Sequence, residues 1–421
     1  MNPKPHLRDI SPVTPLGILT LKNHLERMRI LHIVGTVSPA AGGPTEVIRM
    51  LGRYAPPGYS SELATLDDPT APFLRDLPFP VHALGSSRKH WYRPALLKWL
   101  RKNRSRFDGV IVHGLWEFTG LSALLSVAKL PGYVVFTHGM LDPYFKRTYP
   151  AKHLKKWLYW LPAEYWVLRG ARRVLFTTDA ERDLAAQSFW LHHWNPIVVP
   201  IGSEAPPADT AALLEAFRLA CPQVTGHRFL LFLGRINEKK GCDLLVNAFT
   251  RLCSAHPDLH LVMAGPDPAN WRERIEALAF SSGCTDRIHW PGLLLGDAKW
   301  GAFAACEAFV LPSHQENFGV AVVEALASGR PVLLTHPVNI AQDLEADGCA
   351  LVEPDTQEGI TRLVSRWLAL TPAQQADMAS RARDSFLRRY DMRRNAEAIL
   401  RVFENPGTAQ PSHVNPLPEA R

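Results

Sequence analysis

The sequence predicts an α/β protein with two doubly wound parallel-sheet domains that face each other across a cleft. Three observations support this fold. Apolar runs of strand length alternate with segments of helix length, the alternation occurs in both halves, and 421 residues suffice for two or three domains with separate cores. Strands alternating with helices are typical of parallel sheets that are covered on both faces.

The predicted strands are short, continuous apolar runs, which indicate burial on both faces of a sheet. In the first half they are residues 29–34, 109–113, 133–137, 173–178 and 197–200. In the second half they are residues 228–233, 259–264, 308–311 and 331–334, with helices expected over residues 242–253, 271–280 and 320–328.

Composition indicates the domain boundaries. Residues 28–202 form the predicted N-terminal domain and residues 226–380 the predicted C-terminal domain, joined by a linker over residues 203–225 that opens with SEAPP. Residues 1–27 carry four prolines and no convincing periodicity, so we expect a disordered extension or a segment outside the native start. Residues 405–421 are Pro-rich and polar, and we expect a disordered tail.

The apolar fraction of 46% and the charged fraction of 21% are typical of soluble globular proteins. No apolar run reaches the roughly 18 residues that span a bilayer, and no secretory signal is visible, so we expect a cytoplasmic protein. The six cysteines lack the short paired spacing of a metal site, and we expect reduced, buried thiols. They are Cys221, Cys242, Cys253, Cys284, Cys306 and Cys349.

Three loops follow predicted strands and carry candidate site residues. In the first, SPAAGGPTE, Gly43 lets the backbone approach a ligand before a helix N-terminus, although paired glycines also fit plain turn chemistry. In the second, Gly234 leaves the strand, and Arg235 and Lys240 are placed to converge on one anion; the alternative is a solvated basic turn. In the third, His138 could donate to a substrate oxygen, or could be structural.

The stretch HQENFGVAVVE, from residue 314 to residue 324, sets two carboxylates eight positions apart around a Phe318-Gly319 turn. Glu316 precedes the turn, whereas Glu324 lies on the apolar helix that follows it. Because a buried apolar helix seldom carries a charged residue without a partner, this pair indicates a binding site.

Together these residues resemble the retaining glycosyltransferases of family 4, which have the GT-B fold of two Rossmann-like domains. The resemblance covers residues 28–404. Its most specific element is Glu316 with Glu324, which matches the E-x7-E motif of that family, supported by GR at 234 and KKG at 239. The segments HGLW at 113 and HGMLDP at 138 resemble a subgroup that builds bacterial surface polysaccharides.

The resemblance implies a hexosyltransferase (EC 2.4) that moves a sugar from a nucleotide-sugar donor to a glycan or lipid-linked acceptor, with retention of configuration. It implies that Glu324 accepts hydrogen bonds from the ribose hydroxyls. Glu316 and the backbone N–H groups of Phe318 and Gly319 would hold the donor sugar.

By the same resemblance, Arg235 and Lys240 would neutralise the departing diphosphate, next to the strand end at Gly234. Gly43 would let the first loop close on the phosphates, and His138 would touch the sugar or stabilise charge near it. Prepositioned cations stabilise such a transition state. A helix over residues 381–404 would cross back to the N-terminal domain.

The resemblance also implies that no metal and no other cofactor is needed. An Asp-x-Asp signature is not found in a credible place, since Asp67 and Asp68 are adjacent and followed by a proline. Three alternatives stay open: an enzyme of the same fold but different chemistry, such as a nucleotide-sugar epimerase or a phosphorylase; a dinucleotide-dependent oxidoreductase, whose G-x-G-x-x-G is missing from SPAAGGPTE; and a non-catalytic binding scaffold.

Residues 146–173 hold eight Lys or Arg and one acid, Glu164, with Trp and Tyr side chains among them. Such a segment could contact an anionic membrane from the cytoplasmic side as a peripheral protein does, or it could be an ordinary domain helix whose tryptophans are core. The net charge of +7 is modest, the basic residues are local and nucleic-acid motifs are absent, so we expect no nucleic-acid partner.

Overall fold

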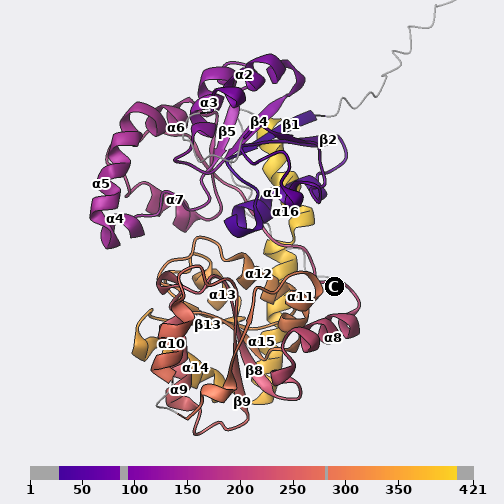
Figure 1. Cartoon of the computed structure of the whole chain (residues 1–421), viewed down its shortest axis with the longest axis vertical. Helices are drawn as coiled ribbons and strands as arrows, with labels where there is room; N and C mark the ends of the chain where they lie inside the picture. The colour runs from indigo at the N-terminus through magenta and orange to yellow at the C-terminus, as the bar shows by residue number, and fades with distance from the viewer. Residues whose placement is uncertain (1–27, 86–92, 280–282, 405–421) are drawn as a thin grey trace, which may run out of the picture.

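Figure 1 shows two α/β domains, one above the other, in a computed structural model of the chain. The structure describes residues 28–85, 93–279 and 283–404. Each domain is built on one parallel sheet, which confirms the predicted fold class. The predicted extension, residues 1–27, and the predicted tail, residues 405–421, lie outside the described residues.

The sheet of the N-terminal domain has seven parallel strands in the order β3-β2-β1-β4-β5-β6-β7. The order reverses beside β1, as it does in a doubly wound sheet. The five strands predicted in this half are all present, whereas β2 and β3 are additional. The strands are β1 (Met28–Val34), β2 (Tyr59–Thr65), β3 (Val81–Ala83), β4 (Gly109–His113), β5 (Tyr133–Phe136), β6 (Val174–Phe176) and β7 (Pro196–Val198).

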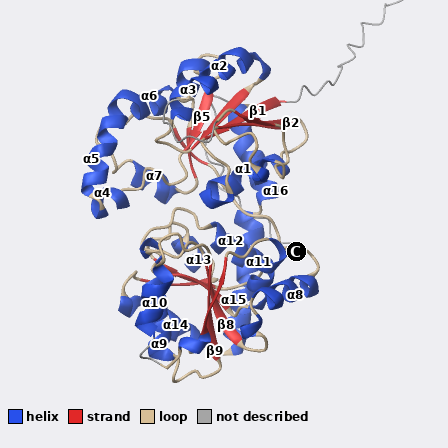
Figure 2. Cartoon of the chain, in the orientation of Figure 1, coloured by secondary structure: helices blue, strands red, loops and turns tan. Residues whose placement is uncertain are grey.

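The helices of the N-terminal domain surround this sheet (Figure 2). Between α5 and α6 the chain passes through a π turn, Trp160–Glu164, which contains Pro162. Trp160 is fully buried and stacks on Phe189, whereas Trp166 is 49% exposed, so only some tryptophans of this segment are core. The helices are α1 (Gly43–Arg53), α2 (Pro94–Asn103), α3 (Phe118–Val127), α4 (Tyr144–Thr148), α5 (Pro150–Tyr159), α6 (Tyr165–Gly170) and α7 (Asp179–Ala185).

The sheet of the C-terminal domain has six parallel strands in the order β10-β9-β8-β11-β12-β13. The four predicted strands form its centre, and β10 and β13 are the additional edges. The strands are β8 (Arg228–Leu233), β9 (Leu259–Ala264), β10 (Ile288–Gly292), β11 (Ala308–Leu311), β12 (Val332–Thr335) and β13 (Ala350–Glu353).

The helices of the C-terminal half include the three that the sequence predicts, within one or two residues at each end. They are α8 (Thr210–Ala220), α9 (Cys242–Leu252), α10 (Trp271–Ala279), α11 (Gly296–Ala305), α12 (Val320–Ala327), α13 (Ala341–Ala346), α14 (Gln357–Leu368), α15 (Pro372–Ser385) and α16 (Met392–Leu400).

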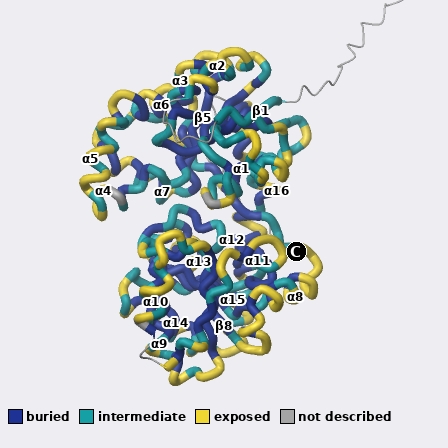
Figure 3. Tube along the Cα trace, viewed as in Figure 1, coloured by how far each residue is buried: buried dark blue, intermediate teal, exposed yellow. Residues whose placement is uncertain are grey.

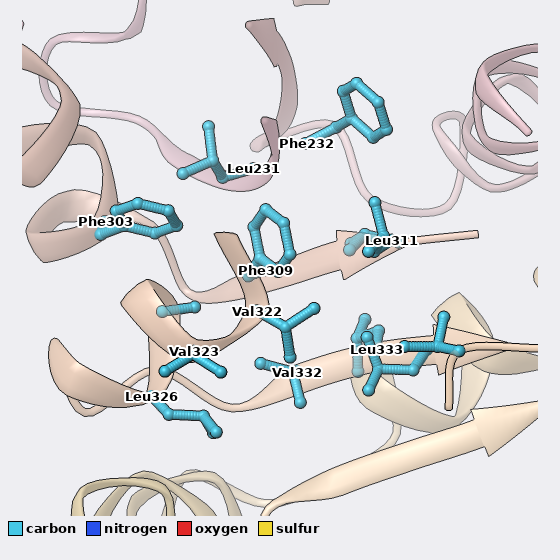
Figure 4. Packing of buried hydrophobic residues seen from close by; sticks show 14 of the residues in the cluster. Leu231, Phe232, Phe303, Phe309, Leu311, Val322, Val323, Leu326, Val332 and Leu333 are labelled. Atoms are coloured by element: carbon cyan, nitrogen blue, oxygen red, sulfur yellow. The ribbon is translucent and has the colours of Figure 1, made fainter. Parts of the chain in front are cut away.

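Part of the core of the C-terminal domain lies between its sheet and α12, and buried residues of α9 and α14 belong to the same core. Figure 4 shows Val322, Val323 and Leu326 of α12 packed beside Phe309 of β11 and Val332 of β12, and all five are fully buried. Figure 3 shows buried residues at the centre of both domains. Helix α12 is buried continuously from Val322 to Ala327, and this close packing holds the loop that precedes it in place.

The predicted linker over residues 203–225 is too long, because α8 occupies much of it. Leu213 and Phe217 of α8 are buried in the core of the C-terminal domain, and α8 packs along α11. The two helices approach closely at Gly301, where a Cβ would lie 1.9 Å from the carbonyl oxygen of Leu213. The amphipathic segment therefore belongs to the C-terminal domain.

The end of the described chain returns to the N-terminal domain. α15 stays on the C-terminal domain, where Ser385 donates to Asp347 over 2.6 Å. After a second π turn, Phe386–Tyr390, α16 packs against α1, and Phe403 lies against Gly109 of β4. The crossing predicted over residues 381–404 thus starts beyond this turn.

One expectation about the cysteines is wrong. Cys253, next to the end of α9, and Cys284, before β10, are joined in a disulfide, whereas the sequence predicts six thiols. The pairing spans 31 positions and brings together segments at one edge of the domain, so no short sequence spacing indicates it. The other four cysteines are free and buried, as expected.

Candidate functional site

Most of the predicted site residues follow the carboxyl ends of strands in both sheets and lie at the boundary between the domains. The loop between β11 and α12 touches the N-terminal domain directly: Gln315 Nε2 donates to Asp142 Oδ2 over 3.0 Å, and Asn317 Nδ2 donates to Thr177 Oγ1 over 3.2 Å. The E-x7-E segment therefore lies in the crevice where ligands of open α/β sheets bind.

Lys240 and Glu316 form an ion pair at the centre of this boundary, with side chains that are 16% and 18% exposed. The backbone fixes Lys240, since its N–H donates to the side chain of Asn237 over 3.1 Å. Gly241 follows with a φ of +62°, and a Cβ there would lie 2.1 Å from the carbonyl oxygen of Pro312. Only glycine allows the lysine loop to lie this close to the segment that carries Glu316.

The charge of Glu316 is set by its neighbours. Burial alone would raise the pKa of its carboxyl, but Lys240 and then Lys239 outweigh burial and hold that pKa below its ordinary value. Burial in turn lowers the pKa of Lys239. Two cations thus face one ionised carboxylate in a partly dry site, where charge interactions are stronger than in water.

The convergence of Arg235 with Lys240 on one anion stays a prediction. The side chain of Arg235 is exposed, and among the described residues it makes no side-chain hydrogen bond or ion pair. Its charge still reaches the site, because it helps to lower the pKa of Lys239. Gly234 lies beneath it, and Gly265 leaves room for the backbone there, since a Cβ on Gly265 would lie 1.8 Å from the Gly234 carbonyl oxygen.

Glu324 has a partner that the sequence-based prediction does not include. Lys299 of α11 donates to Glu324 Oε1 over 2.6 Å, and the side chain of Glu324 is only 6% exposed. Burial raises the pKa of Glu324; Lys299 opposes that rise, while Glu46 of α1 and Glu204 near the domain junction add to it. Lys299 is the one cation in α11, a helix with several buried residues, and this is the signal that could have indicated the contact.

Three helices at this boundary begin after a glycine with positive φ, and none of the three has a side-chain cap. They are α1 after Gly42, α9 after Gly241 and α12 after Gly319. Their first N–H groups have no partner within the helix, and the helix dipole favours an anion there. Gly43 at the start of α1 lies opposite Val320 of α12, whose Cγ2 would be 3.6 Å from a Cβ at position 43.

Phe318 contributes packing as well as backbone. Its side chain is 5% exposed and meets the ring of Tyr390 edge-on, with centroids 5.8 Å apart. Tyr390 ends the π turn at which the chain crosses between domains. The loop that carries Glu316 is therefore in contact with the interdomain crossing.

His138 lies on the opposite side of the crevice in a left-handed backbone conformation, with a φ of +48°. Glu181 stabilises this turn by accepting from Thr137 Oγ1 at 2.6 Å and from the N–H of Gly139 at 2.7 Å. A Cβ on Gly139 would lie 2.5 Å from Asn317, so His138 is next to the turn that follows Glu316. A non-glycine residue keeps such a backbone conformation only where surrounding contacts hold it in place.

The arrangement combines cations, helix N-termini and carboxylates, which suits a ligand that carries both phosphate and hydroxyl groups. Of the predicted residues, the structure brings together Lys240, Glu316, Phe318 and Gly319, with His138 and Gly43 on the facing domain. Across residues 28–85, 93–279 and 283–404, no group of three or more His, Cys, Asp or Glu side chains is placed to hold a metal ion. No helix in the same ranges is long and apolar enough to cross a membrane.

Two family models match the chain. One, described as a glycosyl transferase 4-like domain, matches residues 42–202, and the other, described as glycosyl transferases group 1, matches residues 216–385. Each model covers most of one domain.

Individual proteins are also similar. An alpha-D-kanosaminyltransferase of Streptomyces kanamyceticus is 24% identical over 342 residues, 75% of this chain and 83% of that protein. An uncharacterized glycosyltransferase of Methanocaldococcus jannaschii is 27% identical over 156 residues, 36% of this chain and 39% of that protein. The structure of Anabaena HepE with UDP and glucose superposes with a TM-score of 0.71 at 15% identity, covering 90% of this chain and 99% of that chain.

Proposed function

The chain belongs to the group 1 glycosyltransferases with the GT-B fold, and we propose that it transfers a sugar from a nucleoside diphosphate donor, with retention of configuration, to a glycan or lipid-linked acceptor of a bacterial surface polysaccharide. The observation that carries this proposal is the ion pair between Lys240 and Glu316, which lies among glycine-capped helix N-termini. This site offers positive charge where a diphosphate would leave and carboxylates where hydroxyls would bind.

The reaction breaks the bond between the anomeric carbon and the diphosphate oxygen and forms a bond from that carbon to an acceptor oxygen. With retention, the acceptor attacks from the face that the diphosphate leaves, and the leaving phosphate takes the acceptor proton. Negative charge grows on the diphosphate in this step. Lys240, Lys239 and Arg235 are the cations available to stabilise it, and in this proposal they stand in for a metal ion.

In this proposal the two motif glutamates accept hydrogen bonds from hydroxyl groups of the donor. Glu316, whose pKa is lowered, stays ionised and accepts from the donor sugar, next to the N–H groups of Phe318 and Gly319. Glu324 accepts from the ribose, deeper in the site. Charge-assisted hydrogen bonds of this kind are about twice as strong as neutral ones.

Two substitutions test the site. We expect Lys240→Ala and Glu316→Ala each to lower the rate of sugar transfer by about 10²-fold or more, measured with labelled donor and purified enzyme. Thermal-shift screening against nucleoside diphosphates and nucleotide sugars would first select the donor, because a ligand stabilises the folded state by mass action. Transfer at the normal rate in both variants would contradict the assignment, and an isomerised donor or a sugar phosphate as product would indicate an epimerase or a phosphorylase.

We also propose that α5 and the turn after it contact an anionic membrane that holds the acceptor. Leu154, Leu158 and Leu161 follow helical spacing and are 70%, 80% and 49% exposed. Lys152 and Lys155 are exposed on the same helix, and Trp190 nearby is 81% exposed. Exposed leucine, tryptophan and lysine side chains together suit the interface of an anionic bilayer.

Liposome flotation tests the membrane proposal. We expect the protein to float with vesicles that contain phosphatidylglycerol and to float less with neutral vesicles. The substitution Leu158→Glu should weaken flotation, whereas Leu219→Glu on α8, where the side chain is also exposed at 68%, should not. Equal recovery in the soluble fraction with both kinds of vesicle would remove the proposal.

A further inference from the structure

Three histidines and a serine form a hydrogen-bonded row across the sheet of the N-terminal domain. Ser61 of β2 lies 3.2 Å from His32 Nε2 of β1, and His32 Nδ1 lies 3.0 Å from His113 Nε2 at the end of β4. His113 Nδ1 lies 3.0 Å from His138 Nε2, just after β5. These four strands are neighbours in the sheet, so the row runs without a break from the domain interior to the crevice.

The row is buried and stacked. His32 and His113 are 0% and 1% exposed, their rings stack with centroids 5.2 Å apart, and the rings of His113 and His138 stack at 5.3 Å. Burial lowers the pKa of His32 to about 4 and that of His138 to about 3, and it lowers the pKa of His113 well below its ordinary value. All three imidazoles are therefore neutral at pH 7, and each carries one ring proton.

Neutral rings in series allow only two proton arrangements. If His138 donates from Nε2, every ring donates toward Ser61, and the serine hydroxyl must then donate elsewhere. If Ser61 donates to His32, every ring donates from Nδ1 toward the crevice, and His138 keeps a proton on Nδ1. Within the described ranges the hydroxyl of Ser61 has no hydrogen-bond partner other than His32, so the first arrangement leaves the buried Ser61 hydroxyl without an acceptor. The second leaves over only the N–H of His138 Nδ1, at the crevice end of the row, where a ligand can accept from it.

We propose that His32 and His113 are positioning residues that, together with Ser61, hold His138 as the Nδ1–H tautomer and present that N–H to an oxygen of the bound substrate. His138 then donates a hydrogen bond without carrying a charge. The left-handed turn at His138 and its stacking on Phe136, with centroids 4.3 Å apart, fix the ring for this role. The identity of the substrate oxygen rests on the proposed sugar transfer, whereas the tautomer does not.

Nitrogen-15 NMR of histidine-labelled protein tests the tautomer directly. We expect His138, assigned by the signal lost in His138→Phe, to be neutral and protonated on Nδ1 at pH 7. Ser61→Asp replaces the terminal donor with a carboxylate that only accepts, so His32 must donate from Nε2 and we expect His138 to shift toward the Nε2–H form. Ser61→Thr keeps a hydroxyl and should keep the Nδ1–H form. A wild-type His138 protonated on Nε2, or no change in Ser61→Asp, would overturn the proposal.

Kinetics add a second readout. A catalytic histidine in the wrong tautomer loses up to about 10⁴-fold in rate. Here, with His138 as a neutral donor, we expect kcat for sugar transfer to fall about tenfold or more in Ser61→Asp and in His113→Phe. KM for the donor should change less. The matched control is His260→Phe, which removes a buried histidine that also bonds a histidine, His289, over 2.8 Å but lies away from the crevice. A wild-type protein without transfer activity would refute the proposed function and leave the NMR result standing.

Discussion

Substitution of Lys299 by methionine isolates the electrostatics of Glu324. Lys299 is the ion-pair partner of this carboxylate, at 2.6 Å, and Glu46 and Glu204 act on Glu324 with the opposite sign. Methionine keeps the length and apolar stem of the side chain but removes the charge. Without Lys299, burial and two acidic neighbours act unopposed, so the pKa of Glu324 rises further.

The loss in the free energy of unfolding has an upper limit, because Glu324 can bind a proton and become neutral instead of staying charged without a partner. At pH 7, the pH is about 2.7 units above the ordinary carboxyl pKa of about 4.3, so protonating the carboxylate costs about 3.7 kcal/mol. At pH 5 the same limit is about 1 kcal/mol. A group whose pKa is raised on folding contributes stability below its unfolded pKa and loses that contribution as the pH rises through its folded pKa. The deficit of Lys299→Met in the free energy of unfolding should therefore grow from pH 5 to pH 7.

Thermal unfolding at the two pH values measures this deficit. For a domain of about 200 residues, 1 kcal/mol lowers Tm by about 2–4 °C, so the upper limit of the deficit is about 7–15 °C at pH 7 and only about 2–4 °C at pH 5. The control is Lys98→Met, which removes an exposed lysine of α2 and should change Tm little at either pH. A deficit that is the same at pH 5 and pH 7 would show that Lys299 does not act through the charge of Glu324.

Two further substitutions test buried features of the fold. Burial raises the pKa of Glu164 to about 8, and its Oε2 has no hydrogen-bond partner among the described residues, so the wild type loses stability as the pH rises from about 4.3 through 8. Glu164→Gln should gain in Tm relative to wild type between pH 5 and pH 8.5; a constant difference would contradict this. Gly241→Ala should lower the urea midpoint by more than Gly226→Ala, since both have positive φ but only Gly241 faces a carbonyl oxygen, at 2.1 Å; equal losses would exclude the clash.

The sequence predicts the centre of each sheet because strands buried on both faces are continuous apolar runs. β2 escapes this pattern, since YSSELAT carries polar residues. The structure gives these residues partners: Glu62 pairs with Arg29 and Arg106, and Ser61 bonds His32. In the sequence, polar residues that bond across strands cannot be told from surface residues. The strand β2 can therefore be identified only when its neighbours in the sheet are known.

The candidate site likewise has features that the sequence indicates and contacts that only the folded structure shows. The spacing of Glu316 and Glu324 is a local feature, and the sequence indicates it. The contact of Glu324 with Lys299 joins positions 25 residues apart on different helices. The row of His32, His113 and His138 joins β1, β4 and the loop after β5. Such contacts depend on how elements pack, and no spacing rule within one element describes them.

The two motif glutamates are both buried beside a lysine but differ in their other neighbours, and this difference supports the separate roles proposed for them. Glu316 faces Lys240 and Lys239, which lower its pKa, whereas burial and two acidic neighbours raise the pKa of Glu324. Groups whose environments push their pKa values apart usually take different roles in a site. A ligand that donates hydroxyl hydrogen bonds to Glu324 favours its ionised form, so binding lowers the pKa of that carboxyl and releases any proton it holds. Nucleoside binding should therefore strengthen as the pH rises through the titration of Glu324, while the charge on Glu316 stays constant.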